Sequence, residues 1–196
     1  MFTQNDYYAQ QFKKISGVSN FFSTLTFEDC RFESCDFSEA SFNNCQFLEC
    51  DFVNCNFSLA KFKGTRLQET TFNECKLLGI DWTLINWPSV VLDSLVSFER
   101  CVLNDSSFYG LTLQRLKLLD CRCYEVDFRE GDFNHANFSH SDFTRSLFSR
   151  TNLTAANFSE ALNYDIEIEN NRIKGAKFSR YEAVRLLNSL EIELVD

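Results

Sequence analysis

Nine cysteines and two histidines are the residues of this 196-residue chain that could bind a metal or act as nucleophiles. A structural zinc site needs four converging ligands, and the sequence has neither a Cys-x-x-Cys pair nor a histidine cluster. A free cysteine behaves as a small buried hydrophobe. We therefore expect structural thiols, no metal and no cofactor. Eight of these thiols recur at multiples of five residues, with one shift of frame, at Cys30, Cys35, Cys45, Cys50, Cys55, Cys75, Cys101 and Cys121.

The two histidines, His135 and His140, are five residues apart and hold equivalent positions of the same period. We expect both to face solvent. Neither is visibly paired with a serine or cysteine, as nucleophilic catalysis would require. The sequence also lacks a glycine-rich loop that could cradle a phosphate. We predict no catalytic residue, and the chain is not expected to be an enzyme.

The elements that hold these residues follow a period of five. A phenylalanine stands at every fifth position from 32 to 62, and cysteine or alanine lies two positions before each. Residues two apart in an extended segment point to the same side, so each pair faces inward. The next inward pair comes three residues later, which requires a corner after each phenylalanine. Repeated corners close a coil, and stacked coils form a solenoid with a continuous core.

The repeat is expected over residues 21–178, preceded at 1–20 by a cap or an imperfect first coil. The frame breaks at Asn163 and returns at Ile168. A one-residue slip near 88–97 lies beside the only proline, which favours a corner or irregular turn because it cannot donate a strand hydrogen bond. A tolerated bulge and a surface feature used for contact are both compatible with this slip.

The spacing of the cysteines indicates the number of sides in each coil. Four cysteine pairs are separated by 20 residues and two pairs by 15. This favours four sides of five residues, with like residues stacked about 4.8 Å apart. The predicted fold is therefore all-β, a quadrilateral parallel β-helix with a short helix at its C-terminal end.

Residues 179–196 change character. Ser179 and Glu182 have the spacing of a helix capping box, and apolar residues follow at helical spacing. A short helix cannot bury both this stripe and the open end of the coil. We therefore predict a homodimer joined at the C-termini, with a monomer capped by the helix as the alternative. The predicted dimer residues are Val184, Leu186, Leu187, Leu190, Ile192 and Leu194.

The formal net charge of −9 disfavours direct binding of nucleic acid through its phosphates. With four sides, Asp29, Glu49 and Glu69 are one coil apart and would stack on one edge. We predict that this edge and the slip contact a partner protein, although an ordinary solvated ridge is the alternative. The predicted partner-binding residues are Asp29, Glu49, Glu69, Trp87, Pro88 and Asp93.

No apolar run approaches the length of a membrane span, which is about 18 residues or more. The N-terminus lacks the apolar core of a signal peptide. We therefore expect a cytoplasmic protein without membrane contact.

The triplets Cys-Asp-Phe, Cys-Asn-Phe, Gly-Asp-Phe and Ala-Asn-Phe resemble the repeat of the pentapeptide repeat family, with phenylalanine preferred to leucine at its centre. The resemblance covers roughly residues 20–178. It implies a right-handed, four-sided β-helix. It does not by itself imply a function, so a generic scaffold for protein–protein interaction is one hypothesis.

Segments 77–90, 97–111 and 181–196 resemble a narrower group of that family, the resistance proteins against topoisomerase poisons of the Qnr, albicidin-resistance and microcin-immunity type. This implies a homodimer that mimics DNA, binds DNA gyrase and protects it from poisons, with topoisomerase IV as a second candidate partner. A dimer of about 80 Å would carry twice −9, or −18, whereas duplex DNA of that length carries about 47 charges. Any mimicry would therefore be of shape and of local acidic stripes.

Overall fold

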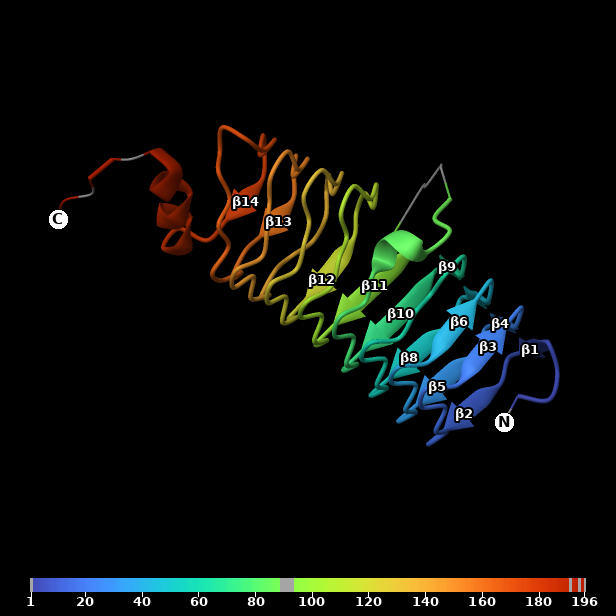
Figure 1. Cartoon of the computed structure of the whole chain (residues 1–196). Helices are drawn as coiled ribbons and strands as arrows, with labels where there is room; N and C mark the ends of the chain where they lie inside the picture. The colour runs from blue at the N-terminus through green and yellow to red at the C-terminus, as the bar shows by residue number, and fades with distance from the viewer. Residues whose placement is uncertain (1, 89–93, 191, 194, 196) are drawn as a thin grey trace.

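The chain forms an all-parallel β-solenoid of about eight coils, with a short helix after the last coil and the two termini at opposite ends (Figure 1). In the part of the chain that the structure describes, no helix is both long and apolar enough to cross a bilayer. The computed structural model describes residues 2–88, 94–190, 192, 193 and 195.

The strands are only two to four residues long, because a corner follows each of them. Two 3-10 helices are described, η1 (Trp82–Leu84) and η2 (Glu182–Leu190). The strands are β1 Asp6–Tyr8, β2 Gln11–Lys13, β3 Phe21–Ser23, β4 Thr26–Glu28, β5 Arg31–Glu33, β6 Ser41–Asn43, β7 Gln46–Leu48, β8 Asp51–Val53, β9 Arg66–Gln68, β10 Thr70–Asn73, β11 Val96–Glu99, β12 Lys117–Leu119, β13 Asn157–Phe158 and β14 Lys177–Phe178.

Stacked residues are 20 apart, as in the series Tyr7, Phe27, Phe47 and Leu67, which confirms four sides of five residues per coil. We number the four faces by the residues at the centres of their sides. Face 1 is centred on Phe22, Phe42, Phe62, Trp82, Phe108, Phe128 and Phe148. Face 2 is centred on Tyr7, Phe27, Phe47, Leu67, Leu113, Phe133 and Leu153. Face 3 is centred on Phe12, Phe32, Phe52, Phe72, Phe98, Leu118, Phe138 and Phe158. Face 4 is centred on Phe37, Phe57, Leu77, Leu103, Cys123 and Phe143.

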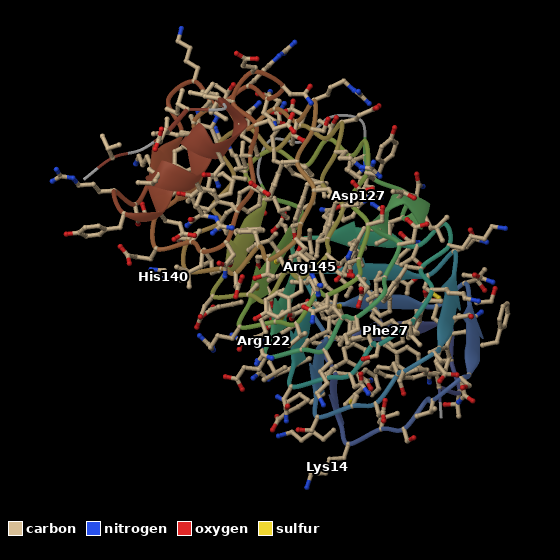
Figure 2. All side chains as sticks on the ribbon, turned by 60° about the vertical axis from the view of Figure 1, so that its left-hand side comes forward. Lys14, Phe27, Arg122, Asp127, His140 and Arg145 are labelled. Atoms are coloured by element: carbon tan, nitrogen blue, oxygen red, sulfur yellow. The ribbon has the colours of Figure 1, made fainter. Side chains whose placement is uncertain are left out.

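The central side chains fill the coil as columns of stacked rings. Phe27 and Phe47 lie 5.2 Å apart with their planes 5° from parallel, and Phe42 and Phe62 are stacked at 5.4 Å. Neighbouring columns meet edge to face, which is a favoured arrangement for aromatic pairs. In Figure 2, Phe27 lies inside the coil, whereas Lys14 projects from a corner. The interior of the described coils is therefore filled by side chains.

The chain turns at the residue two positions after each centre, which adopts a left-handed conformation. Asp29, Glu49 and Glu69 have φ angles of 52°, 53° and 49°. This conformation costs an L-residue roughly 1–2 kcal/mol. A backbone hydrogen bond to the next coil offsets the cost, because the N–H of Asp29 donates to the carbonyl of Leu48 at 3.0 Å.

The first coil is closed at the N-terminal end by Phe2. Its ring lies 5.0–5.6 Å from the rings of Tyr7, Phe12, Phe22 and Phe27. Strands β1 and β2 already pair in register with β4 and β5. Residues 6–20 therefore stack as a coil, and the few residues before them cover its open end.

The interval between stacked residues grows to 26 at one coil, where Phe72 pairs with Phe98. Asn86 and Leu95 still hydrogen-bond to the preceding coil, on either side of its Leu67. The insertion therefore leaves from face 2. Its six extra residues correspond to one five-residue side plus one further residue. The insertion is therefore larger than the single residue that the shift of frame indicates.

The last coil departs from the predicted frame. Tyr164 and Ile166 are 0% and 1% exposed, and Phe148 pairs with Ile166 rather than with Ile168. The expected return at Ile168 is therefore wrong. Asn163 takes a left-handed φ of 55°, which brings the ring of Tyr164 into the core in its place.

The predicted capping box does not form at η2. The hydroxyl of Ser179 hydrogen-bonds to Glu160 instead, accepting from its N–H at 2.6 Å. The carboxylate of Glu182 accepts from the N–H of Asn163 at 2.7 Å. Both side chains therefore tie the helix to the last coil, because the coil offers unpaired backbone donors at its end.

Candidate partner-binding surface

The predicted acidic edge, Asp29, Glu49 and Glu69, occupies consecutive corners between faces 2 and 3. Strands β4, β7 and β9 run directly into these corners and pair in register. All three carboxylates are exposed. The edge exists because these residues are 20 apart in a coil of 20 residues.

Two further carboxylates, Asp6 and Glu28, extend this edge over face 2. They flank the centres Tyr7 and Phe27 on strands β1 and β4 and are exposed. The sequence argument missed both because it followed the corner positions alone. Their positions next to face-2 centres could have identified them. We call these five residues the acidic strip: Asp6, Glu28, Asp29, Glu49 and Glu69.

The acidic strip contrasts with the eight carboxylates of the described residues that form ion pairs. Within the described residues, none of its five members forms an ion pair. Lys13, by contrast, hydrogen-bonds to Glu33 and holds the pKa of that carboxyl below its ordinary value. The first four coils of face 2 carry five carboxylates and one guanidinium, Arg66, a net charge of −4. Paired carboxylates on other parts of the rod include Glu33, Asp51, Glu74 and Glu125.

The inserted loop begins on the same face, next to the acidic strip. The indole N–H of Trp87 donates to the carbonyl of Trp82 at 2.9 Å, and the ring packs partly buried against the core. Pro88 follows and is half-buried. Asp93, the third predicted contact residue of this loop, lies outside the described residues. Two features predicted separately, the acidic edge and the slip, therefore share face 2.

The predicted dimer residues lie on and after η2 at the C-terminal end. Val184 and Ile192 are 47% and 54% exposed. Leu186 packs partly buried against the core, and Leu187 and Leu190 are half-buried. Leu194 lies outside the described residues. η2 lies at the C-terminal end of the rod (Figure 1), and Val184 leaves apolar surface exposed there.

The thiols face inward and are held by the backbone. All nine cysteines are free and buried. Burial raises the pKa of the Cys50 thiol to about 12. His135 and His140 are exposed corner residues on different edges. No group of three or more histidine, cysteine or acidic side chains within the described residues could hold a metal ion.

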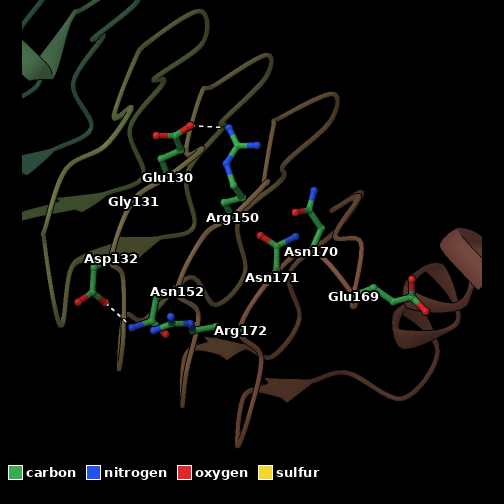
Figure 3. A pocket seen from close by; sticks show the side chains of 9 residues that line it. All are labelled: Glu130, Gly131, Asp132, Arg150, Asn152, Glu169, Asn170, Asn171 and Arg172. Atoms are coloured by element: carbon green, nitrogen blue, oxygen red, sulfur yellow. Dashed lines mark hydrogen bonds and ion pairs between the residues drawn. The ribbon is translucent and has the colours of Figure 1, made fainter.

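A shallow cavity of about 550 Å³ lies on the C-terminal coils (Figure 3). Its polar side chains mostly satisfy one another. Arg150 pairs with Glu130, and the amide of Asn152 donates to Asp132 at 2.8 Å. It contains no nucleophile paired with a base, so the arrangement does not resemble a catalytic site.

A filled coil with four five-residue sides and a phenylalanine-rich centre defines a pentapeptide repeat protein. The sequence profile of the pentapeptide repeat region matches residues 25–95 and 87–158. These matches cover more than half of the chain, which therefore belongs to that family.

Among solved structures, the chain is similar to two trypsin-treated forms of QnrB1, a plasmid-mediated fluoroquinolone resistance protein. One gives a TM-score of 0.74 at 16% identity, over 97% of this chain and 100% of that chain. The other gives 0.65 at 17% identity, over 97% and 99%. At this level of identity the similarity shows a shared fold. No curated protein sequence matches the chain.

Proposed function

We propose that this protein mimics DNA, binds DNA gyrase and protects the enzyme from topoisomerase poisons. The observation that carries the proposal is the acidic strip, because its five carboxylates lie without ion pairs on one side of the rod. Unpaired carboxylates on a rigid surface are available to the basic residues that normally hold DNA phosphates. The shared fold with a fluoroquinolone resistance protein supports the same function.

The charge density of the strip sets the scale of the mimicry. Four stacked coils occupy about 19 Å, and duplex DNA of that length carries about 11 charges. The net charge of the same coils on face 2 is −4. The strip therefore offers about a third of the charge density of DNA, so the proposed mimicry rests on shape and on this local stripe of charge.

The active form in this proposal is a homodimer joined through η2 and the tail. Two rods joined end to end would present a strip on each half, as a length of duplex does to a two-fold enzyme. The poisons against which gyrase is protected are of the quinolone or albicidin class. Topoisomerase IV is a second candidate partner. The rival hypothesis is a generic pentapeptide repeat scaffold that does not bind gyrase.

A supercoiling assay separates these two hypotheses. Gyrase is inhibited with a fixed concentration of a fluoroquinolone or of albicidin, and the protein is added at graded concentrations. We expect supercoiling to return at low concentrations and to fall again at high ones, since a DNA mimic then competes with the substrate. If supercoiling never returns with either poison, the scaffold hypothesis replaces ours.

A charge-reversal variant tests whether the strip carries the effect. Replacing Asp29, Glu49 and Glu69 by lysine changes the net charge from −9 to −3. Lys14 already occupies an equivalent corner, so lysine is compatible with this backbone. We expect this variant to lose protection. The matched control makes the same change of charge at exposed corners on other edges and should keep it, namely Glu39→Lys, Asp105→Lys and Asp120→Lys.

A further inference from the structure

The edge between faces 2 and 3 changes the sign of its charge along the rod. Three columns of residues run along this edge: the corner residues, the residue directly before each corner, and the residue two positions after it. In the first four coils these columns hold one ion pair, between Arg31 and Asp51. The remaining charged residues there are exposed carboxylates without ion pairs, namely Glu28, Asp29, Glu49 and Glu69. The N-terminal half of the edge therefore has a net charge of −4.

The same three columns are basic in the last four coils. Their charged residues are Arg115, Lys117, Lys174 and Lys177, which we call the basic strip. All four are exposed, and none forms an ion pair within the described part of the chain. The other residues of these columns are neutral at pH 7, namely Gln114, Asn134, His135, Asn137, Thr154, Ala155, Asn157 and Gly175. The C-terminal half of the edge therefore has a net charge of +4.

The neighbouring columns do not cancel this asymmetry. On face 2, the next column carries one charge of each sign in either half of the rod. Asp6 and Arg66 balance in the first half, and Asp132 and Arg172 balance in the second. On face 3, the charged residues of the next column all form ion pairs, namely Lys13, Glu33 and Glu99. The two halves of the edge therefore present opposite and uncompensated charge.

We propose that two copies of this chain pair side by side and antiparallel along this edge. The acidic half of each copy lies against the basic strip of the other. A two-fold axis across the rod produces this arrangement, because each copy carries both surfaces on the same edge. Charge complementarity selects a second copy as the occupant. A nucleic acid along the edge would meet the carboxylates of the first half, and the net charge of −9 would repel it.

The spacing of the charges fits a single position of this axis. The corners 69, 95 and 115 belong to successive coils, so an axis at the coil of residue 95 sets Glu69 opposite Arg115. Asp29 and Lys174 are seven coils apart, and their midpoint lies half a coil further along. Half a coil is about 2.4 Å, a difference that the flexible stem of a lysine can span.

The proposed pair is reversible and covers the acidic strip. Contacts between exposed charges are individually weak, so two sets of such contacts give no permanent dimer. At about 0.1 M salt the Debye length is about 10 Å, so opposed charges attract while like charges further along the rods are screened. η2 lies outside the pairing edge. The pairing depends on this chain alone and not on gyrase binding, and a paired copy cannot offer its strip to another partner.

Light scattering of the full chain at two salt concentrations tests the pairing. We expect the mass at about 0.1 M salt to be at least about twice that at about 1 M, where the Debye length is about 3 Å. Association through the apolar surface of η2 persists at the higher salt, so this measurement separates the two modes. An equal mass at both concentrations overturns the proposal.

Cysteine cross-linking tests the antiparallel register. Chains with Leu48→Cys are mixed with chains with Asn134→Cys under mild oxidation, since the native thiols are buried. The two positions lie two coils on either side of the coil of residue 95. The axis therefore sets them opposite each other in two copies, whereas identical positions are about 19 Å apart. We expect cross-links between the two kinds of chain, and a predominance of links between identical chains overturns the proposal.

Reciprocal charge reversal tests the charges themselves. One variant carries Arg115→Glu with Lys117→Glu, and the other carries Glu49→Lys with Glu69→Lys. Neither should pair alone at about 0.1 M salt, whereas their mixture should pair because the reversed charges match. The control variant makes the same change of charge on face 1, where Lys61 and Lys63 are exposed, and should pair like the unchanged chain.

Urea unfolding verifies that every variant folds. The proposal is overturned if the mixture of reversed chains does not pair. It is also overturned if a short DNA duplex binds the unchanged chain and is lost with Arg115→Glu and Lys117→Glu, since the basic strip is then a nucleic-acid site.

Discussion

Replacing Cys75 by alanine should destabilise the protein more than replacing it by serine. The thiol of Cys75 donates to the carbonyl of Phe52 at 3.4 Å and accepts from the N–H of Cys55 at 3.4 Å. Both partners belong to the preceding coil and are buried. Alanine is nearly as small as cysteine, but it leaves the N–H of Cys55 without this acceptor and removes one donor from the carbonyl of Phe52.

The expected loss can be worked out from these contacts. A buried polar group left unpaired costs about 1–3 kcal/mol, and bonds to sulfur belong at the low end of that range. With one buried donor left unpaired, Cys75→Ala should lower the free energy of unfolding by about 1–3 kcal/mol. Serine already makes the same pair of bonds elsewhere. Ser141 accepts from the N–H of Cys121 at 3.0 Å and donates to Leu118 at 2.9 Å, so Cys75→Ser should cost about 1 kcal/mol or less.

Urea unfolding under reducing conditions measures both losses. Cys45→Ala is the matched control, because Cys45 is equally buried but the hydrogen bond of its thiol is longer, at 3.7 Å to the carbonyl of Asn43. We expect a loss of about 1 kcal/mol for this control, from the smaller side chain alone. If Cys75→Ala is as stable as the unchanged chain, or more stable than Cys75→Ser, the thiols act only as space-filling residues and our reasoning fails.

Three further predictions concern pH and the two ends of the rod. Since burial raises the pKa of Cys50 from 9.0 to about 12, the unfolded chain ionises first, and stability should fall between these pH values by up to about 1.4 kcal/mol per unit. Urea titrations at several pH values check this, and Cys50→Ser should flatten the slope. Glutamate at both Leu187 and Leu190 should produce monomers in light scattering, whereas an unchanged mass would rule out the dimer through η2. Phe2→Asp should speed amide hydrogen exchange in β1 and β2 without affecting β11 and β12, because it opens only the first coil. If the amides of β1 and β2 exchange equally slowly in the variant and the parent, Phe2 does not close the first coil.

The coil itself was predictable because its geometry repeats. The phenylalanine period implies inward pairs and corners, and the cysteines separated by 20 residues favour four sides. The stacking of Asp29, Glu49 and Glu69 follows from that number alone. Every coil reuses the same local interactions, so one correct assignment extends over most of the chain.

What the sequence could not supply lies where the repeat is broken. In a five-residue repeat, an insertion of six residues shifts the frame by the same single position as an insertion of one. The sequence therefore indicated one extra residue near Trp87 where the coil has six. Tyr164 entered the core because Asn163 accepts a left-handed φ, which a count of apolar residues does not show. Ser179 bonded to the coil rather than to its own helix, because the end of a solenoid offers unpaired backbone donors nearby.

The 26-residue coil shows which insertions the rod can accept without a change in its stacking. Its loop leaves face 2 and rejoins the coil at the next corner, so Phe98 still stacks on Phe72 and every later side keeps its direction. A gain or loss of 20 residues would instead move the far end by one step of about 4.8 Å and keep each later side on the same face. A change of five residues within the stacked coils would turn everything beyond it by a quarter of a circle. The length of the rod and the orientation of its faces therefore depend on different insertions. A rod of this kind can be lengthened to suit a longer partner while its binding face stays aligned.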